Sequence, residues 1–290
     1  MSVTKRKALR TAFTVLLTLV LFVLLWEGYK WMGQQTEDQW PGTQFGLPVS
    51  TDDLTMPHAS DIFNELTDEI RAGRETLPMT VYLAKKAAFT FLEAAIGFSL
   101  GVIVGLMLAI FMLRWRFAER GFLPWINVSQ TVPLIALAPI VVTWARLQGY
   151  PDMVGISLIA TYLTFFPVAV SGLRGLQSPD SSDVELMRSY AASWSSTLIK
   201  LRLPAARPFL FPAFKLAATL SVVGSIVGEI SIGTKTGLGR AILDFAQRYA
   251  VWPERLYSSV IAASLLGLFV FGLVNAAEWF FIKRGREVLK

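Results

Sequence analysis

Three charged side chains lie within or beside long apolar stretches of the sequence: Glu93, Lys215 and Glu229. Charges inside a membrane are costly and usually functional, so these residues are candidates for a polar path through a bilayer. Lys215 and Glu229 are fourteen residues apart on one predicted helix, about 21 Å, and cannot pair with each other. Each also has another interpretation: Glu93 at the outer headgroup level, Lys215 reaching the interface with its long side chain, and Glu229 either in a structural hydrogen bond or in contact with an external protein.

A second group of candidates combines polar, proline and aromatic residues. The stretch 121–145 holds Asn127, Gln130, Pro124, Pro133 and Pro139. Prolines free backbone carbonyls and bend a helix, which a membrane tolerates only against protein or a wet cavity. Tyr162 and Phe166 could stack on a flat heterocycle, although helical spacing is also typical of packing residues.

The sequence contains no arrangement typical of an enzyme. His58 is the only histidine and there is no cysteine, so neither a catalytic residue, a thiolate metal site nor a disulfide is expected. The stretch GTKTGLG at 233–239 lacks the glycine and lysine order of a phosphate loop and is interpreted as a turn. We expect no cofactor in this chain.

The elements that must position these residues are apolar helices. Hydrophobic residues make up 53% of the 290 residues and charged residues only 17%, which is typical of a polytopic membrane protein. A bilayer core needs about 20 apolar residues. Six stretches satisfy this length: 11–26, 94–113, 121–145, 153–173, about 209–228 and 256–277. The predicted fold is therefore all-α with six transmembrane helices, and Gly97, Gly101 and Gly105 indicate close helix packing in the second.

Lysine and arginine positions predict the orientation. With the amino terminus inside, the basic residues of the tails and of the segments near 114–120 and 174–207 all fall on the cytoplasmic side, together with both termini. The acidic stretch 33–82 is then external, and Ile62, Phe63, Leu66 and Ile70 predict an amphipathic helix in it. The expected parts are 1–32, a tail and first span; 33–82, the external loop; and 83–290, a core carrying the cytoplasmic loop 174–207.

Within that cytoplasmic loop, Ser182 and Glu185 have the spacing of a capping box, which predicts that a helix starts there. Its apolar residues recur at helical spacing, and Pro204 and Pro208 are expected to end it. Such a helix lies on lipid headgroups or docks into a groove of another protein. For Glu185, capping and contact with a partner both remain open.

The same residues resemble the cytoplasmic signature of ATP-binding cassette (ABC) importer permeases. Glu185 matches the acid of the E-A-A motif, and Leu203 and Pro204 match its final Leu-Pro at the family's spacing. Leu186 and Met187 replace the two alanines, and Ala191 replaces the glycine between two short helices. Alanine resists the turn that glycine permits.

The resemblance extends from about residue 56 to the carboxyl terminus. The stretches TFLEAAIGFSLGVIVGLMLAI, SQTVPLIALAPIVVTW and KLAATLSVVGSIVGE are similar to nitrate, sulfonate and taurine permeases, and most similar to the branch for thiamine-pyrimidine precursors or riboflavin. It implies a type I importer permease in a bacterial inner membrane, working as a homodimer with a cytoplasmic ATPase that binds ATP and an external solute-binding protein. Membrane lipid, and no nucleic acid, is the other expected contact.

The resemblance also implies that the surface helix couples transport to ATP hydrolysis. The residues expected at this contact are Glu185, Met187, Arg188, Tyr190, Ala191, Trp194, Leu198, Leu203 and Pro204. Sulfonate, taurine or nitrate import is the alternative within the class. A secondary transporter is the rival class, but it would be expected to show internal repeats, and none is visible.

Overall fold

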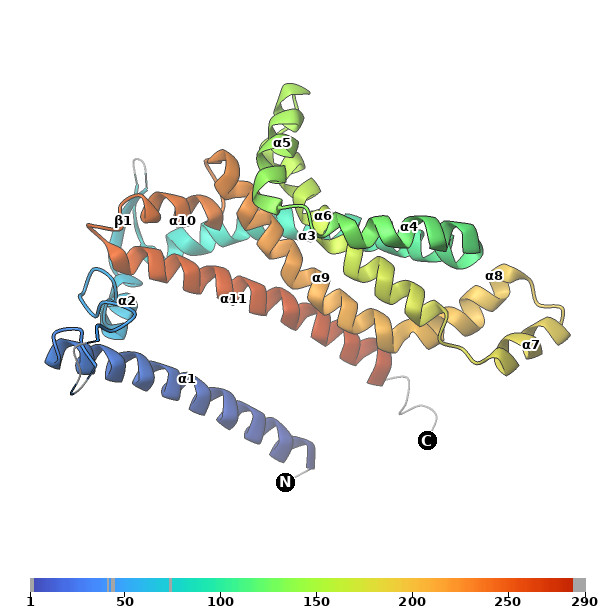
Figure 1. The fold of residues 1–290 in the computed structure, drawn as a ribbon, viewed down its shortest axis with the longest axis horizontal. Coiled ribbons are helices and arrows are strands. Elements are labelled where there is room, and N and C mark those ends of the chain that lie inside the picture. The colour runs from blue at the N-terminus through green and yellow to red at the C-terminus, as the bar shows by residue number, and fades with distance from the viewer. Residues whose placement is uncertain (1–2, 41, 43–44, 73–74, 284–290) are drawn as a thin grey trace. The chain divides into compact units, whose positions relative to one another are not determined.

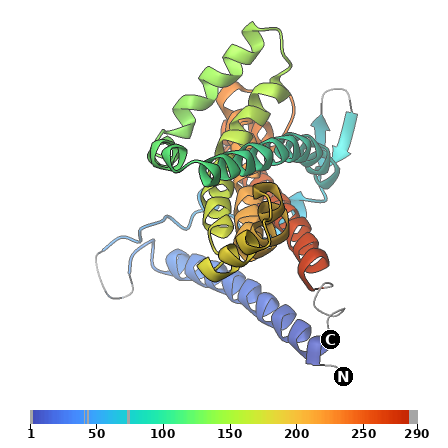
Figure 2. The same ribbon diagram turned by 90° about the vertical axis from the view of Figure 1, so that its right-hand side faces the viewer.

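The computed structural model describes residues 3–40, 42, 45–72 and 75–283 (Figures 1 and 2). The chain divides into two compact units, which we describe separately. Unit 1 comprises Met1–Tyr82 and Asp244–Val260, and unit 2 comprises Leu83–Leu243 and Ile261–Lys290. Four basic residues considered for the orientation, Arg74, Arg284, Arg286 and Lys290, lie outside the described residues.

Unit 1 contains the long helix α1 (Val3–Gln35), the short helix α2 (Ala59–Glu65) and a hairpin of β1 (Glu69–Ala72) and β2 (Glu75–Pro78). The expected amphipathic helix is confirmed only as far as Glu65. Ile70 lies in β1 opposite Leu77 instead, and it is buried there. The helical prediction for Ile70 was wrong because one apolar residue facing inward satisfies a strand as well as a helix.

Hydrogen bonds join the carboxyl-terminal part of unit 1 to its external loop. Tyr249 and Tyr257 both donate their hydroxyl hydrogens to the carbonyl of Thr55, at 3.1 and 2.8 Å. The Nε of Arg255 lies 2.6 Å from Oε1 of Glu65 in a largely buried ion pair. The start of helix α11 (Pro253–Glu278) is thereby fixed to the loop.

Unit 2 is built around helices α3 (Met79–Arg114), α6 (Asp152–Leu176) and α9 (Leu203–Ile232), with α6 packed along α9 (Figure 1). Their core includes Met112, Leu173 and Leu210. The predicted close-packing face of α3 is confirmed. A Cβ built at Gly101 would lie 2.5 Å from the Cβ of Thr164 on α6, and one at Gly97 would overlap Ala160.

The third predicted span is a bent pair of helices rather than one straight helix. Helices α4 (Arg116–Ser129) and α5 (Leu134–Leu147) meet at 100° (Figure 2). Pro133 precedes α5 in an extended conformation and cannot donate a backbone hydrogen bond, so the helix is interrupted there. Among the described residues five helices are long and apolar enough to span a membrane, or six if the bent pair counts as one span.

The remaining helices are α7 (Ser181–Ser189), α8 (Trp194–Thr197), the π-helical turn η1 (Leu198–Arg202), α10 (Leu238–Ala246) and the turn η2 (Trp279–Lys283). The prolines 204 and 208 do not end a helix, contrary to expectation. Pro204 stands in the first turn of α9, where its missing hydrogen is of little consequence, and η1 widens the backbone just before it. The surface segment therefore continues directly into a span.

Candidate functional site

The segment between α6 and α9 forms two short helices separated by a tight turn. Ala191 adopts a left-handed conformation with φ of 50°, so the bend expected of glycine forms with alanine. Ser193 then caps α8, because its Oγ accepts from the backbone N of Ser196 at 3.2 Å. The predicted capping box is absent: α7 begins at Ser181 after Asp180, and Ser182 makes no cap.

Side-chain exposure separates the residues of this segment into three groups. Tyr190 is 77% exposed, and Glu185 and Arg188 are exposed on α7. Leu198 is only 8% exposed and belongs to the core between α6 and α9, so it contributes to folding instead of to a docking face. The partly buried members are Met187, Leu203 and Pro204.

Trp194 packs against the chain itself. The guanidinium carbon of Arg114 lies 5.6 Å from the ring centroid of Trp115 and 5.8 Å from that of Trp194. Trp194 also lines two cavities. The first has a volume of 370 Å³ and is lined by Met107 and Phe111 as well. The second has a volume of 230 Å³ and is also lined by Arg188 and Arg202.

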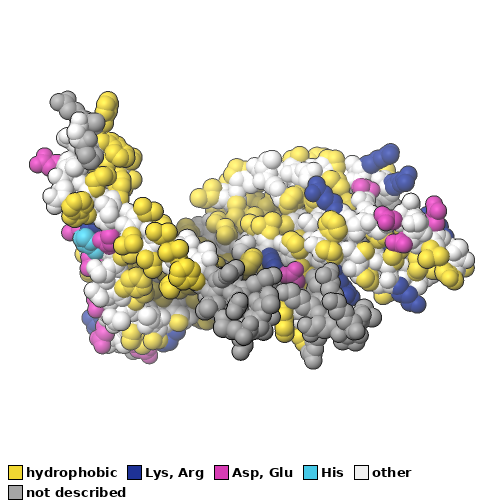
Figure 3. All heavy atoms as spheres, turned by 90° about the horizontal axis from the view of Figure 1, so that it is seen from below, with side chains coloured by type: hydrophobic (Ala, Val, Ile, Leu, Met, Phe, Trp, Pro, Cys, Tyr) yellow, Lys and Arg dark blue, Asp and Glu magenta, His cyan; other side chains and the backbone are white. Residues whose placement is uncertain are grey.

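Charged side chains gather near this segment. The end of unit 2 that carries α7 and α8 shows both basic and acidic side chains among hydrophobic ones (Figure 3). Arg202 is held by a hydrogen bond from its Nη1 to the carbonyl of Leu176, at 2.7 Å. The segment is thus polar where it leaves the apolar helices.

Glu93 and Glu229 come together in unit 2, which the sequence did not predict. Thr90, which bonds Glu229, lies one turn before Glu93 on α3, so the two carboxyl groups lie side by side; the residues are 3% and 0% exposed. Thr90 Oγ1 donates to Oε1 of Glu229 at 2.7 Å, and the backbone N of Gly239 donates to Oε2 at 2.5 Å. The expected structural hydrogen bond of Glu229 is therefore present, and Glu93 is buried within unit 2.

The other path candidates lie apart from this pair. Lys215 forms an ion pair with Glu278 of α11, with 2.5 Å between Nζ and Oε2. Tyr162 donates its hydroxyl hydrogen to the carbonyl of Ser129, at the break between α4 and α5. Phe166 packs against the core of unit 2, and both Asn127 and Gln130 are at least partly exposed.

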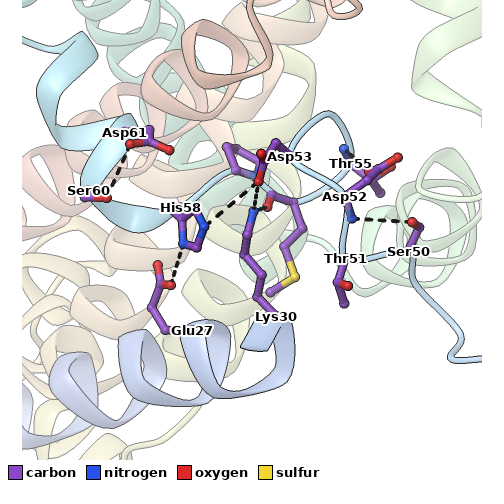
Figure 4. Close-up of polar contacts among 12 residues, drawn as sticks. Glu27, Lys30, Ser50, Thr51, Asp52, Asp53, Thr55, His58, Ser60 and Asp61 are labelled. Carbon is purple, nitrogen blue, oxygen red and sulfur yellow. Dashed lines mark hydrogen bonds and ion pairs between the residues drawn. The ribbon is translucent and has the colours of Figure 1, made fainter. Parts of the chain in front are cut away.

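A polar cluster in unit 1 contains residues that the sequence did not single out (Figure 4). Lys30 of α1 is fully buried and donates to the carbonyl of Met56 and, at 2.6 Å, to Oδ1 of Asp53. The hydrogen bond from Lys30, together with its charge, holds the pKa of Asp53 below its usual value. Nδ1 of His58 lies 2.8 Å from Oε2 of Glu27. The cluster joins α1 to the loop that follows it.

Comparisons with known proteins give a consistent result. The family model for a binding-protein-dependent transport system inner membrane component matches residues 101–280. The formylaminopyrimidine transport permease protein ThiX of Halalkalibacterium halodurans is 31% identical over 69% of this chain and 79% of its own length. The putative aliphatic sulfonates transport permease protein SsuC of Bacillus subtilis is 28% identical over 64% of this chain and 65% of its own.

A solved structure shows the same fold. A chain of the MetNI methionine ABC transporter, in inward-facing conformations, superposes with a TM-score of 0.53 at 17% identity, covering 68% of this chain and 92% of that one. At this identity the likeness concerns the fold alone.

Proposed function

Because the chain belongs to the family of binding-protein-dependent transport system inner membrane components, we propose that it imports a small pyrimidine related to thiamine precursors. The chain is the transmembrane permease subunit of an ABC importer and lies in the inner membrane as a multi-pass protein. The likeness to ThiX over 69% of the chain supports the pyrimidine. Sulfonate import is the second candidate, favoured by the likeness to SsuC.

The segment of α7 and α8 is the contact with the ATPase in this proposal. It is supported by the two-helix shape with a turn at Ala191 and by the exposed aromatic ring of Tyr190. Exposed aromatic residues that become buried at an interface supply much of its binding energy, about 2 kcal/mol or more each. Closure of the ATPase on nucleotide would then move α9 directly, because η1 joins α8 to α9 without a loop.

The arrangement in the membrane is also part of the proposal. Both termini and the 174–207 loop are cytoplasmic, as the lysine and arginine distribution favours. Two copies of the chain form the permease, and Asn127 and Gln130 at the break of the α4 and α5 pair face the path between them. ATP is bound by the separate ATPase and solute by an external binding protein.

Reconstitution into liposomes tests this function. The permease, its ATPase and its binding protein are combined, and uptake of labelled formylaminopyrimidine is measured with riboflavin, taurine and an alkanesulfonate as competitors. We expect uptake that needs ATP and the binding protein and that only the pyrimidine competes for. Competition by the sulfonate alone would support the second candidate. Uptake by the permease alone, driven by an ion gradient, would contradict both.

A further inference from the structure

The contact between Glu93 and Glu229 requires a hydrogen that neither ionised group has. An ionised carboxylate only accepts hydrogen bonds, so two of them cannot bond to each other. The two groups lie on different helices, α3 and α9, and both are almost completely buried. One of the two must therefore carry a proton in this arrangement.

The partners of each group indicate where that proton is. Glu229 already accepts on both oxygens, from the hydroxyl of Thr90 and from the backbone N of Gly239. Thr90 is oriented for this role, since its Oγ1 itself accepts from the backbone N of Leu238 at 2.8 Å. Glu229 is thus surrounded by donors, as an ionised carboxylate requires.

Glu93 has the opposite surroundings. Its Oε2 is buried and has no hydrogen-bond partner among the described residues. Ser157 donates nearby, at 3.3 Å, but to the backbone carbonyl of Glu93. An ionised Glu93 would leave a bare charged oxygen in a dry site, which is strongly unfavourable. We propose that Glu93 and Glu229 form a binding site for a single proton. Glu93 carries this proton and donates it in a hydrogen bond to an ionised Glu229. This contact, which we call the clasp, holds α3 against α9 and α10.

The loop before α10 is shaped around this site. Gly237 has φ of 89°, and a Cβ built there would overlap the carboxylate of Glu229. A Cβ at Gly239 would lie 2.9 Å from Oε2. Gly237 and Gly239 of the GTKTGLG stretch therefore let the backbone and the positive end of α10 approach the charge on Glu229. This explains the glycines without a phosphate ligand.

The charges around the pair agree with one negative charge on it. The positive charge of Lys86 on α3 attracts a negative charge on Glu229, whereas the negative charge of Asp152 on α6 repels one on Glu93. Asp152 is itself held by Arg146 of α5, at 2.5 and 2.8 Å. Loss of the proton from Glu93 would place two negative charges in contact beside the positive charge of Lys86. The proton on Glu93 therefore keeps the clasp closed, and its loss would open the clasp, whichever solute is carried.

Isosteric substitutions test the position of the proton. Glu93→Gln retains a donor toward Glu229, so its Tm in detergent should stay within about 2 °C of the unmodified protein. Glu229→Gln turns an amide donor toward Thr90 or Gly239 and should lower Tm by about 5 °C. The reverse order, or equal effects of the two substitutions, would overturn the proposal.

Infrared spectroscopy of the purified permease gives a second, independent readout. The unmodified protein should show the carbonyl band of a buried protonated carboxyl group near neutral pH. Glu93→Gln should abolish it, whereas Glu69→Gln, which changes an exposed glutamate of β1, should leave it in place. Absence of the band from the unmodified protein would overturn the proposal, even if a variant fails to fold. Neither measurement depends on the transported solute.

Discussion

The guanidinium of Arg114, at the end of α3, lies 5.8 Å from the ring centroid of Trp194, the first residue of α8. This contact ties the start of α8 to a transmembrane helix. Trp194 is 41% exposed, whereas Tyr190, four residues earlier, is 77% exposed. The two aromatic residues of the segment therefore differ: Trp194 contacts the transmembrane helix α3, whereas the ring of Tyr190 is left exposed, where the proposed function places the ATPase.

Alanine substitutions separate these two roles. Tyr190→Ala should weaken association with the ATPase by about tenfold or more, as the loss of a buried aromatic residue does, while leaving Tm unchanged. Trp194→Ala should lower the free energy of unfolding by about 1 kcal/mol through the lost cation–π contact and packing. Tm and ATPase co-purification are measured for both variants. A Tyr190→Ala variant that binds the ATPase normally would show that the docking residue lies elsewhere.

Ala191 stores strain that glycine would remove. An alanine in the left-handed region costs about 1–2 kcal/mol. Glycine removes this cost, but it also increases the entropy of the unfolded chain, which offsets part of the gain. Ala191→Gly should therefore stabilise the permease by about 0.5–1 kcal/mol, measured by thermal unfolding in detergent. Ala192→Gly, one residue further on and without a positive φ, should destabilise it slightly. A decrease in stability for Ala191→Gly would be inconsistent with the φ of 50°.

Substitution of a glycine in α3, with a glycine of α11 as the control, tests how the helices pack. Gly97→Ala should cost about 1–3 kcal/mol, because the new methyl group overlaps Ala160 of α6. Gly267→Ala in α11 meets no atom within 4 Å in this chain and should be neutral or slightly stabilising. Expression level and Tm check both variants. Equal Tm values for the two would mean that α3 and α6 do not pack as described.

The ion pair of Lys30 and Asp53 predicts an acid dependence of unit 1. The pKa of Asp53 lies below its usual 3.8 because of Lys30, so the stabilisation is present at neutral pH and is lost as the pH falls through that lowered pKa. Asp53→Asn should lower stability at neutral pH by about 1 kcal/mol, a small value because Asp53 is exposed. It should also flatten the dependence on pH in the acid range below the usual pKa of an aspartate.

Unfolding curves at several pH values check this prediction. Asp68→Asn, a change of an exposed aspartate without an ion pair among the described residues, serves as the control and should keep the dependence of the unmodified protein. An Asp53→Asn variant with the full acid dependence would assign that dependence to another group.

Features that depend on residues close together in the chain were predictable from the sequence. The apolar stretches near 94–113, 153–173 and 256–277 lie within α3, α6 and α11. The turn of the family's glycine position forms at Ala191, although alanine resists this conformation. Apolar length and motif spacing are local properties, so they can be recognised without knowledge of contacts.

Features that depend on distant contacts or on backbone detail could not be predicted. No periodicity indicates that Glu93 meets Glu229 or that Lys215 meets Glu278, because these pairs join different helices. Pro133 indicated a bend but not one of 100°. Pro204 was predicted to end a helix, and this was wrong. The π-helical turn η1 accommodates the proline, and such a turn cannot be recognised from the composition.

The central claim is that the α7 and α8 segment lies inside the cell, where it meets the ATPase. The chain has no cysteine, so a single Ser195→Cys variant can be labelled specifically with a membrane-impermeant maleimide, and Ser60→Cys in the opposite loop provides the control. We predict that intact cells label position 60 only, and that inverted vesicles label position 195 unless the ATPase is bound. Labelling of position 195 from outside intact cells would contradict the account.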